Sequence, residues 1–311
     1  MNYPKALKKG MTIGIVAPSG ARNNDVIVPR MKSFWENKGY KMVLGTSCTS
    51  KHGYLAGSDD VRASDINCFF RDSSIDAIFC ARGGYGAARL LPKLDYQMIR
   101  SHPKIFLGYS DITALHSALN RYSDFVTFHG PNGDIAADDE NTLISFQSLM
   151  QALTSESGYE LVNPPGYPRV TLQGGCARGQ LTGGNLTLIA HSLGTPWAPD
   201  FRGKILFLED IGEYTYRIDE MLLNLKYAGA FDECAGILLG EFTNCQIEYP
   251  DYGMTLEAIF DEIGFPKDKP ILRGIRSGHC NPKLTLPMGV LCHMNADSQR
   301  VLLLESPVQS N

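Results

Sequence analysis

The stretch KIFLGYSDITALHSAL, residues 104–119, changes from apolar to polar within six residues and then takes up helical spacing. Its first four residues predict a buried strand, and its later apolar residues fall on one face of a helix. Between them lies the turn Gly-Tyr-Ser-Asp, residues 108–111, which is too short to be a linker. The stretch therefore predicts a tight strand-to-helix turn with Ser110 at its tip.

Similar apolar runs recur through the first half of the chain and alternate with helical patterns. They lie at residues 12–18, 41–45, 75–81 and 125–130, and a last helix is expected over 141–153. Continuous apolar strands separated by helices predict a parallel sheet covered on both faces, in a Rossmann-like α/β domain. In such sheets the functional site lies at the carboxyl ends of the strands, which is where Ser110 is expected.

The second half of the chain has a different pattern of predicted elements. A segment rich in Pro, Gly and Ser predicts a linker over residues 156–172, between domains at 1–155 and 173–311. Beyond the linker we expect strands at 204–209, 236–242, 285–293 and 300–304, and helices near 185–193, 216–228 and 254–264. This order predicts a mixed α/β domain with a barrel-like sheet.

Composition excludes several classes of protein. The 311 residues are 43% hydrophobic and 20% charged, with a net charge of −4, so nucleic acid is not an expected partner. No run of about 18 apolar residues predicts a membrane span, and the amino-terminal apolar run is too short for a signal peptide. The eight scattered cysteines form no CxxC pair and predict reduced thiols in a cytoplasmic protein, with no metal site.

A serine on a strand-to-helix turn is suited to acyl transfer. Its hydroxyl is held clear of the sheet, beside free N–H groups of the helix that can stabilise an oxyanion. The motif here departs from G-x-S-x-G, because Ile112 stands at the last position. The alternative is that Ser110 or Asp111 only caps the helix.

A glycine-rich loop, CARGGYGAARLL at residues 80–91, follows the third predicted strand. The glycines expose backbone N–H groups, which can bind a nucleotide phosphate or form half of an oxyanion hole facing Ser110. The G-x-G-x-x-G and P-loop spacings are absent, so no nucleotide cofactor is expected. Arg82 is a candidate to bind a substrate carboxylate, although a structural arginine is an equal alternative.

A serine nucleophile needs a base and an acid from elsewhere in the chain. His116 and His129 could line the same sheet edge, and His279 lies in a loop of Gly, Ser, Asn and Pro residues. Glu209 ends a buried apolar run, where an acid is costly unless it is paired, but Asp210 is an equal candidate.

Five blocks together resemble the serine LD-carboxypeptidases, the murein tetrapeptide carboxypeptidase family. They are RGGYGAARLL, GYSD, TGGNLTLIAHSLGTPW, ILFLEDIGEYTYRIDEMLLNL and the SGH loop, in that order over nearly the whole chain. The resemblance implies that Ser110 is the nucleophile, Glu209 the orienting acid and His279 the general base. It also implies an oxyanion hole from the backbone N–H groups of Gly84 and Asp111. Arg82 and Asn185 are expected to contact the substrate.

The reaction implied by this resemblance is hydrolysis that releases D-alanine from murein tetrapeptide during cytoplasmic peptidoglycan recycling, by a homodimer. A related branch, the microcin C self-immunity peptidases, cleaves peptidyl or aminoacyl-adenylate analogues with the same triad. We rank that branch second, because the stretch between Phe242 and Met254 leaves little room for a large nucleotide-binding loop. A third alternative is a ligand-binding module without catalysis.

Overall fold

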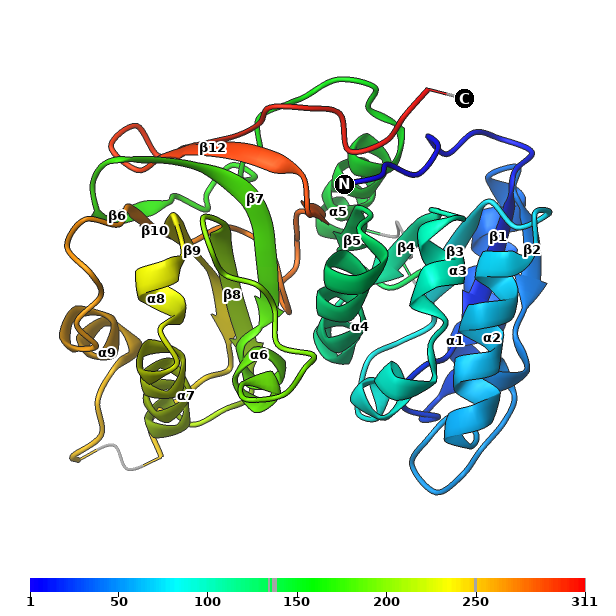
Figure 1. Cartoon of the computed structure of the whole chain (residues 1–311), viewed down its shortest axis with the longest axis horizontal. Coiled ribbons are helices and arrows are strands. Elements are labelled where there is room, and N and C mark those ends of the chain that lie inside the picture. Colours follow the sequence, from blue (N-terminus) through cyan, green and yellow to red (C-terminus); the bar gives the residue numbers. More distant parts are fainter. Residues whose placement is uncertain (134, 136–138, 249–250, 311) are drawn as a thin grey trace.

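The computed structural model describes residues 1–133, 135, 139–248 and 251–310, in which two sheets lie side by side with helices packed around them (Figure 1). The first sheet has the strand order β11-β5-β4-β3-β1-β2, and all its neighbours are parallel except β11 and β5. Its strands are β1 Thr12–Val16, β2 Lys41–Leu44, β3 Ala77–Cys80, β4 Ile105–Gly108, β5 Thr127–His129 and β11 Leu286–Met288.

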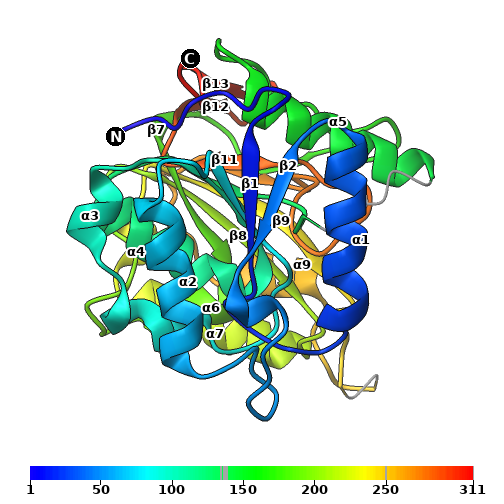
Figure 2. The same ribbon diagram turned by 90° about the vertical axis from the view of Figure 1, so that its right-hand side faces the viewer.

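Helices cover both faces of this sheet, and α1 and α2 lie on opposite sides of β1 and β2 (Figure 2). Ser58 caps α2, since its side chain accepts a hydrogen bond from the Val61 N–H. The α-helices of this half are α1 Asn24–Asn37, α2 Asp59–Arg71, α3 Tyr96–Arg100, α4 Thr113–Ala118 and α5 Glu140–Thr154. Short helical turns of other types are η1 Thr46–Cys48, η2 Ala87–Lys93, η3 Ser110–Ile112 and η4 Leu119–Ser123.

The second sheet is mixed, with the strand order β13-β12-β7-β8-β9-β10-β6, and it curls into a half-barrel. Its central strands β7 to β10 are parallel, whereas β6, β12 and β13 pair antiparallel. The strands are β6 Val170–Gln173, β7 Cys176–Asn185, β8 Ile205–Ile211, β9 Gly236–Thr243, β10 Ile271–Arg273, β12 Leu291–Asn295 and β13 Arg300–Leu303. The helices are α6 Leu186–Ser192, α7 Thr215–Tyr227, α8 Ala230–Glu233 and α9 Leu256–Glu262. The predicted α/β class with two different sheets is confirmed.

The second half differs from the prediction in several places. The run at 285–293, predicted as one strand, is two, because Gly289 turns the chain with a φ of 97°. The first part, β11, joins the first sheet, and the second part, β12, joins the second. In addition, β7 was not predicted, and β6 begins inside the expected linker 156–172. The division at that linker stays a prediction.

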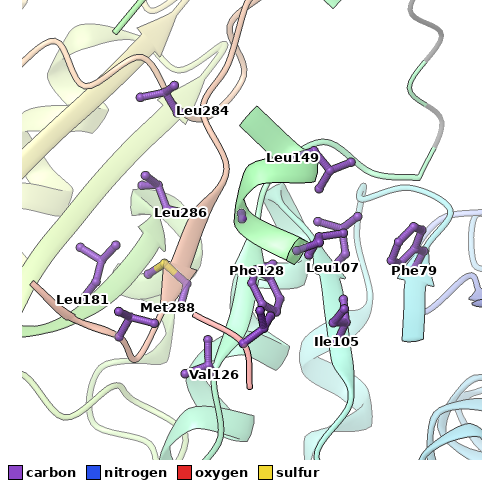
Figure 3. Packing of buried hydrophobic residues seen from close by; sticks show 14 of the residues in the cluster. Phe79, Ile105, Leu107, Val126, Phe128, Leu149, Leu181, Leu284, Leu286 and Met288 are labelled. Atoms are coloured by element: carbon purple, nitrogen blue, oxygen red, sulfur yellow. The ribbon is translucent and has the colours of Figure 1, made fainter. Parts of the chain in front are cut away.

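The strand β11 carries part of the core that joins the two sheets. Leu286 and Met288 are fully buried in one hydrophobic cluster with Phe128 of β5 and Leu181 of β7 (Figure 3). Removing a buried side chain of this size leaves a cavity that costs about 2–5 kcal/mol. This packing therefore holds the edges of the two sheets together next to the end of β4.

Candidate active site

The nucleophile turn follows β4 directly. Ser110 has a φ of 66°, in the left-handed region that an L-residue occupies at a cost of about 1–2 kcal/mol. Gly108, just before it, is needed for space, because a Cβ there would lie 2.9 Å from the Ile112 side chain. A strained serine between a strand and a helix start is the geometry of a nucleophile elbow. Ile112, which breaks the usual sequence motif, packs on the glycine at the end of the strand.

The glycine loop lies against this turn. A Cβ on Gly83 would be 3.1 Å from the Ser110 Oγ, so only glycine allows the loop to approach so closely. The next residue, Gly84, is exposed with a φ of 120° and lines the same cavity as Ser110. Asp111 is the second residue of η3, where an N–H has no acceptor within its own helix. The two predicted oxyanion donors therefore flank Ser110.

A buried arginine supports this loop, and sequence reasoning missed it. Arg62 of α2 is fully buried and donates hydrogen bonds to the carbonyls of Pro18 and Gly86. The Asp111 carboxylate accepts from the Ser19 hydroxyl at 2.6 Å and from the Ala87 N–H at 2.8 Å. Burial raises the pKa of Asp111, and these hydrogen bonds and the Arg62 charge oppose that rise. Together they fix the glycine loop relative to the nucleophile turn.

The candidate acid and base lie in direct contact. Glu209 is fully buried, and its Oε2 accepts from the His279 Nδ1 at 2.8 Å and from the His279 N–H at 3.2 Å. The pairing of β8 with β9 shifts register between Leu208 and Asp210, and such an irregularity re-aims a side chain. A Cβ on Gly278 would lie 2.4 Å from the same oxygen, so the contact needs glycine before the histidine.

The neighbouring acid, Asp210, has a different role. Its carboxylate accepts hydrogen bonds from the Asn185 Nδ2 at 2.9 Å and from the N–H and hydroxyl of Thr187, and so holds the start of α6. Burial is the largest influence on Asp210 and raises its pKa. Asn185 also caps α6 through Leu188, and only 3% of it is exposed. The Asn185 side chain is thus bonded inside the fold, and its contact with the substrate stays a prediction.

Ser110 and His279 line one cavity of about 430 Å³. Because the Nδ1 of His279 donates to a carboxylate, its Nε2 is the nitrogen left to accept a proton. Among the described residues, Ser110 Oγ and His279 form no hydrogen bond, and such contacts tighten when substrate binds. The arrangement can deprotonate a serine and hold a protonated imidazole.

The other two candidate histidines lie below the turn and do not line this cavity. Both are buried, and the ring Nε2 of His116 donates to the Gly108 carbonyl at 2.9 Å. Burial lowers the pKa of His116 to about 4 and lowers that of His129 well below its ordinary value. They are neutral supports of the turn at neutral pH.

Arg82 holds the glycine loop, and its role in binding a substrate carboxylate stays a prediction. Its guanidinium donates to the carbonyls of Arg22 and Gly83, which makes it a clamp on the loop. It also lines the cavity of Ser110 and an adjoining cavity of about 370 Å³.

Within residues 1–133, 135, 139–248 and 251–310, no group of three or more His, Cys, Asp or Glu side chains is arranged to hold a metal ion. None of the helices in that part of the chain is both long and apolar enough to cross a membrane.

In a comparison with known proteins, two family models match the two halves of the chain. Residues 13–130 match the model of the LD-carboxypeptidase N-terminal domain, and residues 178–294 match that of the C-terminal domain. The probable murein peptide carboxypeptidase of Bacillus subtilis is 40% identical over 99% of this chain and 96% of its own.

Two solved structures are similar over nearly their full lengths. MccF in complex with glutamyl sulfamoyl guanosine has a TM-score of 0.91 at 26% identity, covering 99% of both chains. The muramoyltetrapeptide carboxypeptidase from Oxalobacter formigenes has a TM-score of 0.83 at 29% identity, covering 96% of this chain and 100% of its own.

Proposed function

The chain belongs to the LD-carboxypeptidase family, and from this premise we propose that it is a serine carboxypeptidase acting on murein tetrapeptide. It hydrolyses the L,D-amide bond and releases the terminal D-alanine. The observation that carries the proposal is the strained Ser110 facing a glycine loop, in one cavity with a histidine that is bonded to a buried glutamate.

In the proposed mechanism, the Nε2 of His279 accepts the proton of Ser110 as the Oγ attacks the scissile carbonyl. The N–H groups of Gly84 and Asp111 stabilise the oxyanion, and buried Glu209 stabilises the imidazolium. His279 then gives its proton to the amine of the leaving D-alanine as the C–N bond breaks. Water, activated by the same histidine, hydrolyses the acyl-enzyme and restores the serine.

A microcin-type substrate is the second candidate, and the higher TM-score to MccF favours it. The higher sequence identity to a murein peptide carboxypeptidase favours the tetrapeptide. The stretch between Phe242 and Met254 includes residues 249–250, which lie outside the described residues. The expectation that it leaves little room for a nucleotide-binding loop therefore stays a prediction.

We also propose peptidoglycan recycling as the biological role, the cytoplasm as its site, and a homodimer as the working form. The names of murein-acting relatives support the first of these. Sedimentation of the purified protein at micromolar concentration tests the homodimer, which predicts twice the mass of the 34.2 kDa chain.

The test is incubation of the purified protein with free tetrapeptide, UDP-linked tetrapeptide and an aminoacyl sulfamoyl adenylate, with mass-spectrometric readout. Loss of one alanine from the tetrapeptides, absent with Ser110→Ala, supports the proposal. Cleavage of the adenylate analogue alone supports the microcin-type alternative. Tight binding of a tetrapeptide without any turnover identifies a ligand-binding module and overturns the enzymatic proposal.

A further inference from the structure

A second cavity opens next to the cavity of Ser110, and the two share Arg82, Tyr109, Ile27 and Asn132 as walls. Three basic side chains, Arg30, Arg82 and Lys283, line this second cavity, and none of its described lining residues is acidic. A pocket with concentrated positive charge beside a catalytic serine favours an anionic part of the substrate.

Lys283 is the basic residue that is connected to the catalytic histidine through the ring of Tyr109. Its Nζ lies 4.1 Å from the ring centroid of Tyr109, and the centroid of the same ring lies 4.8 Å from that of His279. Among the described residues, no carboxylate lies within ion-pair distance of this Nζ. Within the described part of the chain, the lysine charge is therefore held beside the general base without a carboxylate partner.

The geometry of the reaction indicates which part of the substrate lies near Lys283. In acyl transfer the histidine protonates the leaving amine, so the leaving group lies on the His279 side of the serine. The oxyanion donor Gly84 belongs to the glycine loop and lines the Ser110 cavity but not the Lys283 cavity. When the leaving group is one amino acid, its carboxylate lies about 3–4 Å from the departing nitrogen. Tyr109 borders both cavities and contacts both His279 and Lys283, so the Lys283 cavity adjoins the side of the site from which the amine leaves.

We propose that Lys283 binds the terminal carboxylate of the substrate, and thereby restricts the enzyme to removing one residue from a free carboxyl end. The inference rests on the proposed carboxypeptidase function and assigns it a specificity-determining residue. Arg82 borders the same cavity, and apolar Ile27 and Ala81 provide a wall for a small leaving side chain. An amide or an extended chain at the carboxyl end would lose the charge that Lys283 recognises.

The experiment compares tetrapeptide with the same peptide carrying a carboxyl-terminal amide. Calorimetry in the Ser110→Ala background measures both dissociation constants without turnover. Because a charge-assisted hydrogen bond contributes strongly to affinity, the free acid is expected to bind about tenfold or more tightly than the amide. Lys283→Met, which keeps the aliphatic stem, is expected to weaken acid binding by about that factor and to change amide binding less than about twofold.

Two variants serve as controls. Lys283→Arg keeps the charge and is expected to retain most of the preference for the acid. Lys267→Met removes an exposed lysine that lines neither cavity and is expected to leave both constants unchanged. The proposal is overturned if the Ser110→Ala protein binds acid and amide equally, or if Lys283→Met keeps the full preference.

The outcomes also separate this inference from the proposed function. If the protein with Ser110 intact cleaves tetrapeptide but Lys283→Met discriminates as before, the function stands and the lysine assignment fails. If the intact protein cleaves no tetrapeptide, the proposed function is wrong. The dissociation constants of the free acid and the amide then still decide whether Lys283 binds a carboxylate.

Discussion

Replacing Glu209 with Gln tests the proposed catalytic charge with little change in shape. The carboxylate lies 2.8 Å from the ring nitrogen of His279 and is fully shielded from solvent. Two unit charges about 4 Å apart at an effective dielectric constant of about 20 interact by about 4 kcal/mol. That interaction stabilises the imidazolium in the transition state, and a tenfold rate change corresponds to about 1.4 kcal/mol. We therefore expect kcat to fall by about 100- to 1,000-fold.

The same substitution has a smaller structural cost. The other oxygen of Glu209, Oε1, is buried without a hydrogen-bond partner, so one end of the new amide is left unsatisfied. An unsatisfied buried donor costs about 1–3 kcal/mol of stability. The unfolding midpoint should fall by several degrees while the protein stays folded at 25 °C.

The assay is release of D-alanine from tetrapeptide, with circular dichroism to verify folding. Asp210→Asn is the matched control, because this neighbouring acid bonds to Asn185 and Thr187 instead of His279. We expect that variant to lose stability and to keep most of its kcat. If Asp210→Asn is the more damaging change in folded protein, or if Glu209→Gln keeps a tenth of the activity, the assignment of the acid is wrong.

Three further predictions follow from the site. Ser110→Ala should remove turnover by several orders of magnitude while tetrapeptide still binds, and a tenth of the original rate would exclude a serine mechanism. Gly278→Ala should lower kcat with little change in KM, since the added Cβ would lie 2.4 Å from the Oε2 of Glu209; an unchanged kcat contradicts the close contact. Finally, burial lowers the pKa of His116 to about 4 from its ordinary value of 6.5. The unfolded chain therefore binds a proton that the folded protein does not, and about 3 kcal/mol of stability should be lost as the pH falls from 6.5 to 4. Urea titrations should give a shallower pH slope for His116→Gln, and an equal slope would contradict this origin.

The buried strands were predictable because their side chains face the core on both sides. The runs that became β1, β3 and β4 are continuously apolar, which is the pattern of a parallel strand covered by helices. In contrast, β7 has the sequence CARGQLTGGN, whose glycines and polar residues disfavour a strand. It forms because β8 and β12 pair with it on either side, and the local sequence does not indicate those partners.

The candidate site shows the same division between local and tertiary information. The strand-to-helix turn and the glycine loop are local, so Ser110 and Gly84 could be proposed from the sequence. Arg62 could not, since an arginine among acidic residues in a helix has the pattern of an exposed side chain. Its burial depends on carbonyls from separate loops, including those of Pro18 and Gly86.

The resemblance implied Glu209, whereas the residues of the strand alone left the choice between the two acids open. Alternation along a regular strand places adjacent residues on opposite faces but does not say which of them meets a histidine. The irregular pairing after Leu208 and the approach of Gly278 determine the orientation of Glu209. Neither feature has a signal in the strand's own sequence.

The path of the chain explains how the base is held near the nucleophile. His279 lies on the connection from β10 of the second sheet to β11 of the first, and the Ser277 hydroxyl closes that connection by donating to the Leu284 carbonyl. The strand β11 pairs with β5, and β5 pairs with β4, whose end leads into Ser110. The loop that carries His279 therefore starts at the second sheet and ends in the sheet whose strand β4 leads into Ser110.

Glu209 is the member of the proposed triad that comes from the second sheet. The loop of His279 is also bonded to that sheet, since the Ser277 carbonyl accepts from the Glu241 N–H of β9. A shift between the sheets would therefore move Glu209 and His279 together relative to Ser110. A substitution that loosens the packing between the sheets, such as Met288→Ala, would change the approach of His279 to the serine before it weakens the contact with Glu209. The buried cluster around β11 thus supports catalysis as well as stability, because it holds the acid and base of one sheet against the serine turn of the other.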